Sequence, residues 1–350
     1  MRRAAPPFES RQRLGRWLLP AVSVTLLVAS ASAQAATPKE LLAAGRVDEA
    51  IQTLRQRVEH SSADHSSADH SSADHSSVAH SSDAESFNYL CRAYYMLEEW
   101  DRGIAACERA RDLDPQKSLF YLWLGRIYGE KASRVGFMSA AGMVKKVRIN
   151  FERAVELAPT DWEARADLAE FYLEAPGIVG GGKEKARVQA DALMPLNPAM
   201  SHWVAGRIAD KSKDVAGAEA EYRAAIAVNP AAGRAWVDLA ALLFRSNRLD
   251  EMEHVLHGLE SAPVAQREAL RDGASLLARA GRDPALAIRL LRLYLTAPVE
   301  QGPAFKAHDL LGQLLEKQGD RHAAAAEYRA ALALAHNYKS AQENLKRVEP

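Results

Sequence analysis

One spacing recurs along this chain and limits its possible folds more than any other feature. The residues Gly206, Ala218, Tyr222, Ala225 and Pro230 are separated by 12, 4, 3 and 5 positions. The same separations recur in four further sets, which begin at Cys91, Ala240, Ala274 and Gly312. Steps of three and four place side chains on one face of a helix, and the jump of 12 crosses a turn into a second helix. The spacing therefore predicts an all-α chain built from pairs of antiparallel helices.

The residue types at these positions fit close packing within each pair. Gly206 leaves room for the second helix to approach, Tyr222 fills the space beside it, and Pro230 ends that helix. A single pair of this size cannot bury its own apolar face, so neighbouring pairs must stack to form a shared core.

This unit resembles the tetratricopeptide repeat, a helix-turn-helix of about 34 residues. The resemblance covers roughly residues 37–336 and about eight repeats. It implies a right-handed superhelical solenoid of antiparallel helix pairs. We expect an opening repeat with a shortened first helix at 36–59, the main array at 85–336, and a polar capping helix at 337–350.

Two insertions interrupt the array near 131–147 and 175–183. Both fall at turns of adjacent repeats, so we expect them to form one lobe at the edge of the solenoid. Its apolar residues are Phe137, Met138, Met143, Ile178 and Val179. The alternative is that these residues pack only against their own helices.

The second insertion contains most of a phosphate-binding loop pattern in "APGIVGGGKEKA". Gly177, Gly182 and Lys183 match G-x-x-x-x-G-K, but Glu184 stands where a Ser or Thr hydroxyl should hold Mg²⁺. A predicted helix, not a strand, precedes the loop. The sequence therefore predicts a glycine-rich turn and no nucleotide site.

The first 35 residues read as an export signal. A segment with five arginines precedes an apolar stretch from Trp17 to Ala29, and Ala33-Gln34-Ala35 fits the A-x-A cleavage pattern. The apolar stretch is short for a membrane span. We expect cleavage before Ala36, no stable membrane span afterwards, and a periplasmic or secreted protein; an uncleaved anchor is the alternative.

Residues 60–84 repeat a five-residue unit of His, Ser, Ala and Asp. Such a composition cannot bury a core, and it predicts a disordered linker. Its histidines are candidate metal ligands, although a step of five residues moves successive side chains off one helical face. These candidates are His60, His65, His70, His75 and His80.

The chain has two cysteines, Cys91 and Cys107, both at repeat-core positions. Counted from the turn between their helices, they lie at similar heights. An exported protein allows a disulfide between them. Two buried free thiols are the alternative.

The family resemblance implies that the first helix of each repeat lines a concave groove that binds a protein or peptide. Arginines beside aromatic residues suit recognition of carboxylates and backbone; alternatively, they pair with acidic residues across the groove. The predicted groove residues are Asn88, Arg92, Tyr95, Arg126, Trp203, Arg207, Phe244, Arg245, Arg279 and Lys317. Further groove positions are Glu170, Asp210, Arg271, Asp309 and Gln313.

The chain carries 45 Lys and Arg against 45 Asp and Glu, without the basic excess of a nucleic-acid binder. It shows no motif for catalysis and none for a cofactor. We therefore expect a non-enzymatic interaction scaffold of the cell envelope. Two alternatives are an accessory subunit of an envelope enzyme or assembly machine, and a His-rich metal-binding protein.

Overall fold

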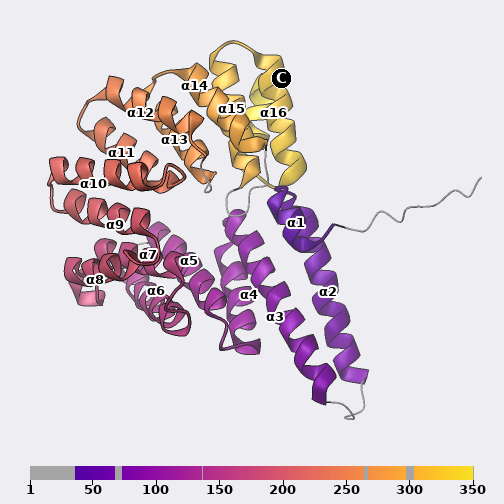
Figure 1. Ribbon diagram of the computed structural model, residues 1–350. Helices are drawn as coiled ribbons and strands as arrows, with labels where there is room; N and C mark the ends of the chain where they lie inside the picture. The colour runs from indigo at the N-terminus through magenta and orange to yellow at the C-terminus, as the bar shows by residue number, and fades with distance from the viewer. Residues whose placement is uncertain (1–35, 68–72, 136, 264–266, 297–302, 350) are drawn as a thin grey trace, which may run out of the picture. The chain divides into compact units, whose positions relative to one another are not determined.

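The computed structural model describes residues 36–67, 73–135, 137–263, 267–296 and 303–349 (Figure 1). For 62–67, 73–80 and 137–139 it describes the backbone alone. These described residues form seventeen α-helices, one short 3-10 helix and no strand. The expected export signal, 1–35, lies outside them.

The helices pair along the chain, each pair joined by a short turn, as the repeat spacing predicts. The eight pairs are α1 (Pro38–Ala43) with α2 (Val47–Ser67), α3 (Ala73–Met96) with α4 (Trp100–Leu113), α5 (Ser118–Arg134) with α6 (Phe137–Leu157), α7 (Trp162–Glu174) with α8 (Lys183–Leu193), α9 (Pro198–Lys211) with α10 (Val215–Val228), α11 (Gly233–Arg245) with α12 (Leu249–Ser261), α13 (Glu268–Ala280) with α14 (Pro284–Leu295), and α15 (Ala304–Lys317) with α16 (Arg321–Leu334). The short helix η1 (Gly177–Val179) lies between α7 and α8, and α17 (Lys339–Val348) follows the last pair at the position of the predicted cap.

In two pairs, called here the regular pairs, a glycine of the first helix lies against a tyrosine ring of the second. A Cβ atom built on Gly206 of α9 would lie 2.6 Å from the ring of Tyr222 on α10. In the α15/α16 pair, a Cβ on Gly312 would lie 2.5 Å from the Tyr328 ring. Both tyrosines are fully buried. Glycine at these positions thus sets how closely the two helices approach, as the sequence predicted.

Neighbouring pairs stack so that their first helices contact one another. Contacts join α7 to α9, α9 to α11, α11 to α13 and α13 to α15. One apolar cluster runs through the stack from Leu54 of α2 to Val348 of α17. The array is therefore an all-α solenoid with a continuous core.

The first and last repeats of this array meet (Figure 1). Leu42 of α1 and Met96 of α3 share a second apolar cluster with Phe305 of α15. The carboxylate of Asp48 accepts a hydrogen bond from the backbone N–H of His336 at 2.9 Å and pairs with its ring Nδ1 at 2.6 Å. These polar contacts join residues 288 positions apart in sequence.

The low-complexity tract differs from the disordered linker that we predicted. Helix α2 continues through it to Ser67, and α3 begins within it at Ala73. The two helices pack side by side, and the Ser61 hydroxyl donates to the Asp83 carboxylate at 2.6 Å. Two helices already paired through their apolar ends can continue as a hairpin on Ala-containing sequence without a core of their own. Residues 68–72 lie outside the described residues.

The first insertion also differs from the predicted lobe. Its residues lengthen α5 to 17 residues and α6 to 21 residues. Helix α6 does contact η1 of the second insertion, so the two insertions are neighbours. Met143 packs against the main core, whereas Ile178 is 91% exposed. The side chains of Phe137 and Met138 lie outside the described residues.

Candidate functional site: a charged cavity between the first helices

A cavity of about 790 Å³ lies between the first helices of the repeats. Side chains from α3, α5, α7, α11, α13 and α15 supply most of its wall. Its aromatic residues include Tyr95, Trp100, Trp123, Phe151, Phe171 and Tyr338. Its charged residues are Glu98, Arg126, Glu130, Arg134, Asp167, Glu170, Glu174, Arg234, Glu268, Arg271, Lys306 and Asp309.

Three aromatic rings form one wall of the cavity. Tyr95 meets Trp100 and Trp123 edge to face, with ring centres 5.8 and 5.6 Å apart. The Arg134 guanidinium carbon lies 4.8 Å from the Trp100 ring centre, and that of Arg126 lies 5.0 Å from the Trp123 ring centre. Cations over ring faces add attraction to the area that the rings bury. The rings on this wall are thereby held in fixed positions.

A chain of buried ion pairs crosses from α5 through α7 to α11. Arg126 binds Asp167 at 2.6 Å, and Arg234 binds the same carboxylate at 3.1 Å. Burial alone would raise the pKa of Asp167, but the two guanidinium groups outweigh it and hold the pKa below its ordinary value. Asp167 is therefore a charged link between three repeats.

The pKa of Glu170, farther along the wall, shifts in the opposite direction from that of Asp167. Burial raises the pKa of this carboxyl, although Arg207 lies 3.1 Å away and Arg234 lies 4.0 Å away. Arg207 also binds Glu174 at 3.1 Å. The arginines of this wall are thus engaged with acidic neighbours, which is the alternative that the sequence left open.

The structure places Tyr95 and Arg126 of the predicted groove in the cavity wall, together with Glu170, Arg271, Asp309 and Gln313. Arg92 lies against the same wall, with its guanidinium carbon 5.1 Å from the Trp123 ring centre. The prediction is wrong for Trp203, which is only 2% exposed. Its indole N–H donates to Asp238 at 2.7 Å, so this ring packs between repeats and does not face a partner.

Other predicted groove residues also lie away from the cavity wall. Asn88 is buried, with 3% of its surface exposed. Arg245 pairs with Asp210 at 2.6 Å, while Arg279 lies over the Phe244 ring. Lys317, at the end of α15, borders a separate small cavity. These positions lie at or near helix ends or inside the core, where repeat spacing alone does not show which way a side chain faces.

Sequence reasoning missed several residues of the wall, among them Trp123, Asp167, Arg234 and Glu268. A signal for part of this set was present in the repeat. Arg234, Glu268 and Lys306 each stand six positions before the small residue of their repeat, and all three line the cavity. This shared offset marks a cavity-facing position in the last three repeats.

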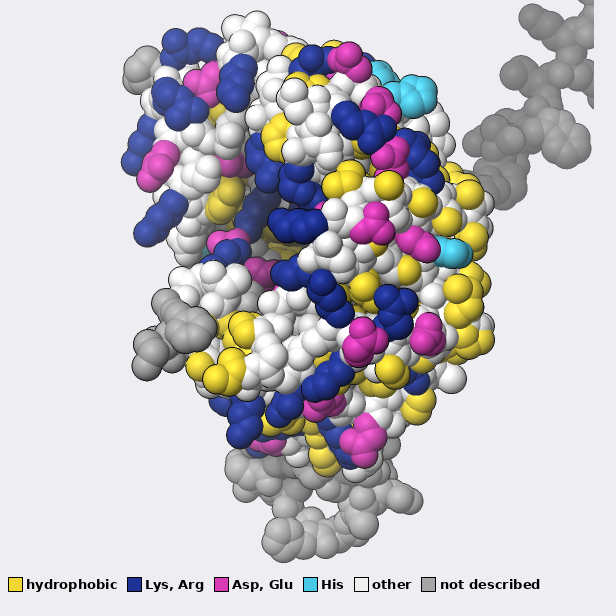
Figure 2. All heavy atoms as spheres, turned by 90° about the vertical axis from the view of Figure 1, so that its left-hand side faces the viewer, with side chains coloured by type: hydrophobic (Ala, Val, Ile, Leu, Met, Phe, Trp, Pro, Cys, Tyr) yellow, Lys and Arg dark blue, Asp and Glu magenta, His cyan; other side chains and the backbone are white. Residues whose placement is uncertain are grey.

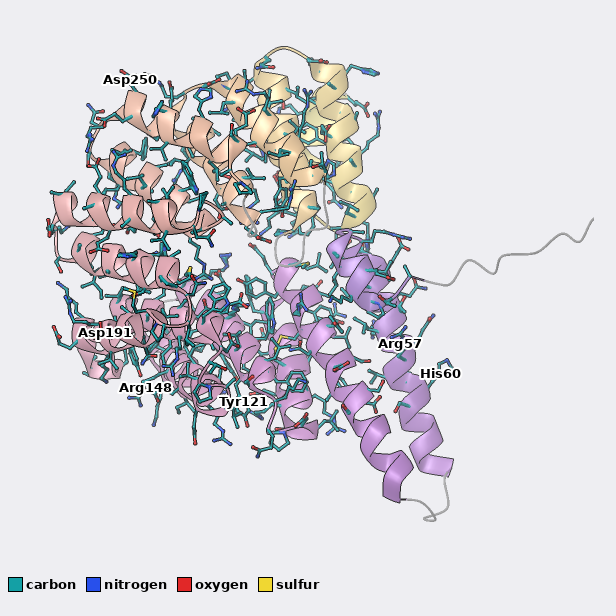
Figure 3. All side chains as sticks on the ribbon, in the orientation of Figure 1. Arg57, His60, Tyr121, Arg148, Asp191 and Asp250 are labelled. Atoms are coloured by element: carbon teal, nitrogen blue, oxygen red, sulfur yellow. A yellow bond between two sulfur atoms is a disulfide. The ribbon has the colours of Figure 1, made fainter. Side chains whose placement is uncertain are left out.

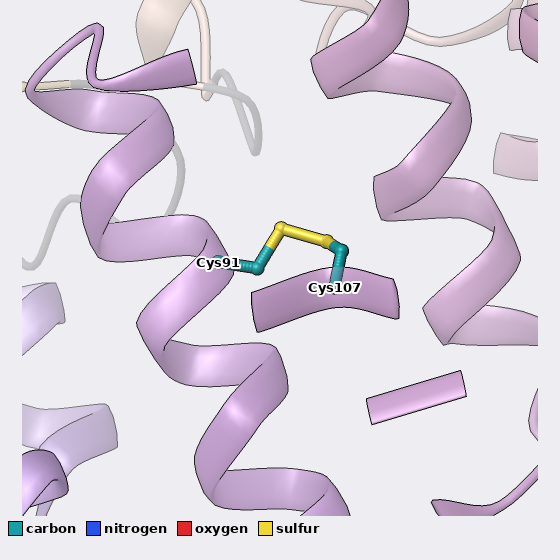
Figure 4. The surroundings of a disulfide bond; sticks show 2 residues. All are labelled: Cys91 and Cys107. Atoms are coloured by element: carbon teal, nitrogen blue, oxygen red, sulfur yellow. A yellow bond between two sulfur atoms is a disulfide. The ribbon is translucent and has the colours of Figure 1, made fainter. Parts of the chain in front are cut away.

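In the α3/α4 pair, Cys91 and Cys107 are joined by a disulfide, with Cα atoms 5.1 Å apart (Figure 4). Both residues are fully buried. By repeat spacing they occupy the positions that Gly206 and Tyr222 occupy in α9/α10. The covalent bond therefore replaces the glycine–tyrosine contact of the regular pairs.

The glycine-rich stretch forms a turn between α7 and α8. Gly182 donates its N–H to the carbonyl of Tyr172, and Gly180 has a φ of 101°, which favours glycine. Lys183 donates to the Ser212 hydroxyl at 2.9 Å. The element before the turn is a helix, so the loop lacks the strand that a phosphate-binding loop follows.

Of the histidines in the low-complexity tract, only the His60 side chain is described; it is exposed on α2 (Figure 3). Those of His65, His70, His75 and His80 lie outside the described residues. Within the described ranges, no group of three or more His, Cys, Asp or Glu residues is arranged to hold a metal ion.

The outer surface is mixed in charge. On the face shown in Figure 2, Lys and Arg side chains stand beside Asp and Glu side chains over much of the surface. No helix among the described residues combines the length and apolar character needed to cross a membrane.

Comparison with known proteins identifies the repeat. A family model described as tetratricopeptide repeat matches residues 204–251, and a second with the same description matches residues 305–347. A search of curated proteins finds no match.

Among solved structures, yeast Tom70 is similar with a TM-score of 0.57 and 15% identity, over 86% of this chain and 59% of that chain. The APC/C hetero-tetramer Cut9-Hcn1 gives a TM-score of 0.38 and 12% identity, over 89% of this chain and 54% of that chain. A tetratricopeptide repeat protein from Parabacteroides merdae gives a TM-score of 0.35 and 18% identity, over 76% of this chain and 99% of that chain. This chain thus spans little more than half the length of the first two. The paired helices, their repeat spacing and the two matched segments together make this chain a tetratricopeptide repeat protein.

Proposed function

We propose that the protein is a non-enzymatic scaffold that holds a segment of a partner polypeptide in the cavity between its first helices. The observation that carries the proposal is the composition of the cavity wall, which draws on six of the eight first helices. A segment bound there contacts most of the array at once. Aromatic and arginine side chains of the kind that line this wall carry much of the binding energy in protein interfaces.

Tyr95 adds a polar group that suits such a partner. Its hydroxyl has no hydrogen-bond partner within the described part of the chain, and burial raises its pKa above the ordinary value. Tyr95 is only partly buried and lines the cavity, where a bound segment can reach it. A backbone carbonyl of a bound segment would accept its hydrogen bond.

Crosslinking tests the proposal. A photoreactive phenylalanine analogue replaces Tyr95 in cells, and a matched variant carries it at Ala220, which is exposed on α10. We expect one discrete crosslinked polypeptide from position 95 and none from position 220. Equal crosslinking at both positions, or none at position 95, would contradict partner binding in the cavity.

We further propose that the scaffold works in the cell envelope. The charged and apolar pattern of residues 1–35 supports export. The disulfide also supports it, because disulfides form and persist in oxidising compartments. The N-terminal residue of protein isolated from the envelope tests this. We expect Ala36; retention of residues 1–35 on a cytoplasmic protein would contradict export.

A further inference from the structure

Every cationic side chain that lines the cavity is already paired with a carboxylate. The pairs are Arg126–Asp167 (2.6 Å), Arg234–Asp167 (3.1 Å), Arg134–Glu98 (3.0 Å), Lys306–Glu98 (2.5 Å) and Arg271–Asp272 (2.8 Å). A carboxylate on an incoming partner would therefore find each cation engaged. It would have to displace an existing pair, which is most unfavourable at Arg126 and Arg234, because they share the buried carboxylate of Asp167.

Two carboxylates of the same wall have no ion-pair partner within the described residues. Asp309 of α15 is 3% exposed, and its oxygens accept hydrogen bonds from the Ser340 hydroxyl at 2.7 Å, the Asn344 amide at 2.8 Å and the Gln313 amide at 3.0 Å. All three donors are neutral. Glu268, on the neighbouring helix α13, forms neither a hydrogen bond nor an ion pair with any described residue.

The unbalanced charge of the cavity wall is thus negative, and the two carboxylates without an ion-pair partner lie on α13 and α15, which contact each other. Asp309 is buried, whereas Glu268 is partly exposed to the cavity. A cation brought to a desolvated carboxylate without a counter-ion gains more than it would in bulk water.

We infer that the partner segment is cationic and presents a Lys or Arg side chain to Glu268 and Asp309. The inference rests on the proposed function, since it names the chemistry of the segment that the cavity holds. It reverses the expectation drawn from the sequence, in which arginines of the groove recognise partner carboxylates. Those arginines instead hold the wall together, and the unpaired acids select the partner.

Fluorescence anisotropy with labelled peptides tests this on the purified full-length protein. The peptides have equal length and the same Gly, Ala and Ser background, and they carry Lys, Arg, Gln or Glu at the same positions. We expect the Lys and Arg peptides to bind at least about tenfold more tightly than the Glu peptide, as a charge-assisted contact allows. Added salt should weaken that binding.

Two variants locate the contact. Glu268→Gln and Asp309→Asn should each weaken binding of the Lys peptide about tenfold. Glu268→Gln removes no hydrogen bond of the folded chain, so it keeps the test valid even if Asp309→Asn unfolds. The control is Glu343→Gln, at an exposed carboxylate on α17, which should bind like the wild type.

Gln or Glu peptides that bind as tightly as Lys peptides would overturn the inference. The same holds if no peptide binds, or if Glu268→Gln has no effect. The proposed function fails by a different result, the absence of a crosslinked partner at position 95, so the two failures are distinguishable.

Discussion

The α3/α4 and α9/α10 pairs use the same two repeat positions for a contact between their helices but differ in chemistry. In α3/α4, a disulfide joins Cys91 to Cys107. In α9/α10, Gly206 lies against the ring of Tyr222, and no covalent bond is involved. The repeat therefore fixes where two helices cross, while the residues at the crossing decide whether the contact depends on packing or on a bond.

Two buried aspartates of the cavity wall also differ in how they are held. In the first half, the buried Asp167 of α7 binds Arg126 of α5 and also reaches Arg234 of α11. In the second half, the buried Asp309 takes only neutral donors from within its own end of the array. Neutralising Asp167 should therefore act through the charges of two arginines, whereas neutralising Asp309 affects only neutral donors.

The largest effect is expected at the buried ion pairs. Asp167→Asn removes the buried carboxylate that Arg126 and Arg234 share, leaving them only Glu163 at 3.0 Å and Glu170 at 4.0 Å. We expect the free energy of unfolding to fall by about 3–5 kcal/mol at pH 7. Urea unfolding measures it. The control is Asp101→Asn, whose carboxylate is 88% exposed and pairs with Lys131; it should cost less than about 1 kcal/mol.

The same variant should respond to pH in a defined direction. The pKa of Asp167 is lowered in the folded protein, so its stabilisation is complete above the ordinary aspartate pKa of about 3.9 and is lost as the pH falls through the lowered value. The difference between wild type and Asp167→Asn should shrink in acid. A difference that stays constant down to pH 3 would contradict a charged Asp167.

The next effect concerns the disulfide. Its cysteines are 16 residues apart, and replacing both Cys91 and Cys107 by Ala should lower the free energy of unfolding by about 3 kcal/mol. Urea unfolding of the wild type with a reductant should show a similar loss. The double variant is the control, because a reductant should leave its free energy of unfolding unchanged. If the reductant does not change the free energy of unfolding of the wild type, the disulfide is contradicted.

Disturbed packing in the α9/α10 pair should lower the free energy of unfolding by a smaller amount. Gly206→Ala places a methyl group 2.6 Å from the Tyr222 ring, and we expect a cost of about 1–3 kcal/mol. Gly142→Ala on α6 is the matched control, because no atom lies within 4 Å of its added Cβ. That change should stabilise the helix by up to about 1 kcal/mol. Equal effects of the two changes on urea unfolding would contradict the close approach.

The smallest effect on stability is expected from removing the hydroxyl groups of Tyr222 and Tyr328, which occupy the same repeat position. The Tyr328 hydroxyl donates to Glu316 at 2.9 Å, whereas the buried Tyr222 hydroxyl has no partner among the described residues. Tyr328→Phe should cost about 1 kcal/mol, and Tyr222→Phe should be neutral or slightly stabilising. Thermal unfolding of both variants checks this. A larger loss for Tyr222→Phe would show a partner that the structure lacks.

The sequence predicted the helix pairs well because their signal is local. The spacing from Gly206 to Pro230 lies within one unit, and it recurs unchanged where the family models also match. The composition of residues 60–84 predicts a linker, because composition carries no information about the helices on either side. Those helices extend into the tract. A lone low-complexity segment would lack such neighbours.

The cavity was harder to predict for a geometric reason. Which side chains meet across it depends on small rotations between repeats that add up along the array. Repeat spacing therefore predicts Trp203 in the groove although the residue is buried, and it does not predict that the first and last repeats meet. The shared offset of Arg234, Glu268 and Lys306 shows how much a repeat-by-repeat alignment can still recover.

The central claim is that eight stacked hairpins bring the first and last repeats together and so enclose the cavity. Asp48→Cys combined with His336→Cys tests it, because these residues are in direct contact. After oxidation and proteolysis between the two sites, the fragments should stay joined on a non-reducing gel. The control pairs Asp48→Cys with His322→Cys, at the opposite end of α16, and its fragments should separate. If the Asp48/His336 pair also separates, the ends do not meet and the account is wrong.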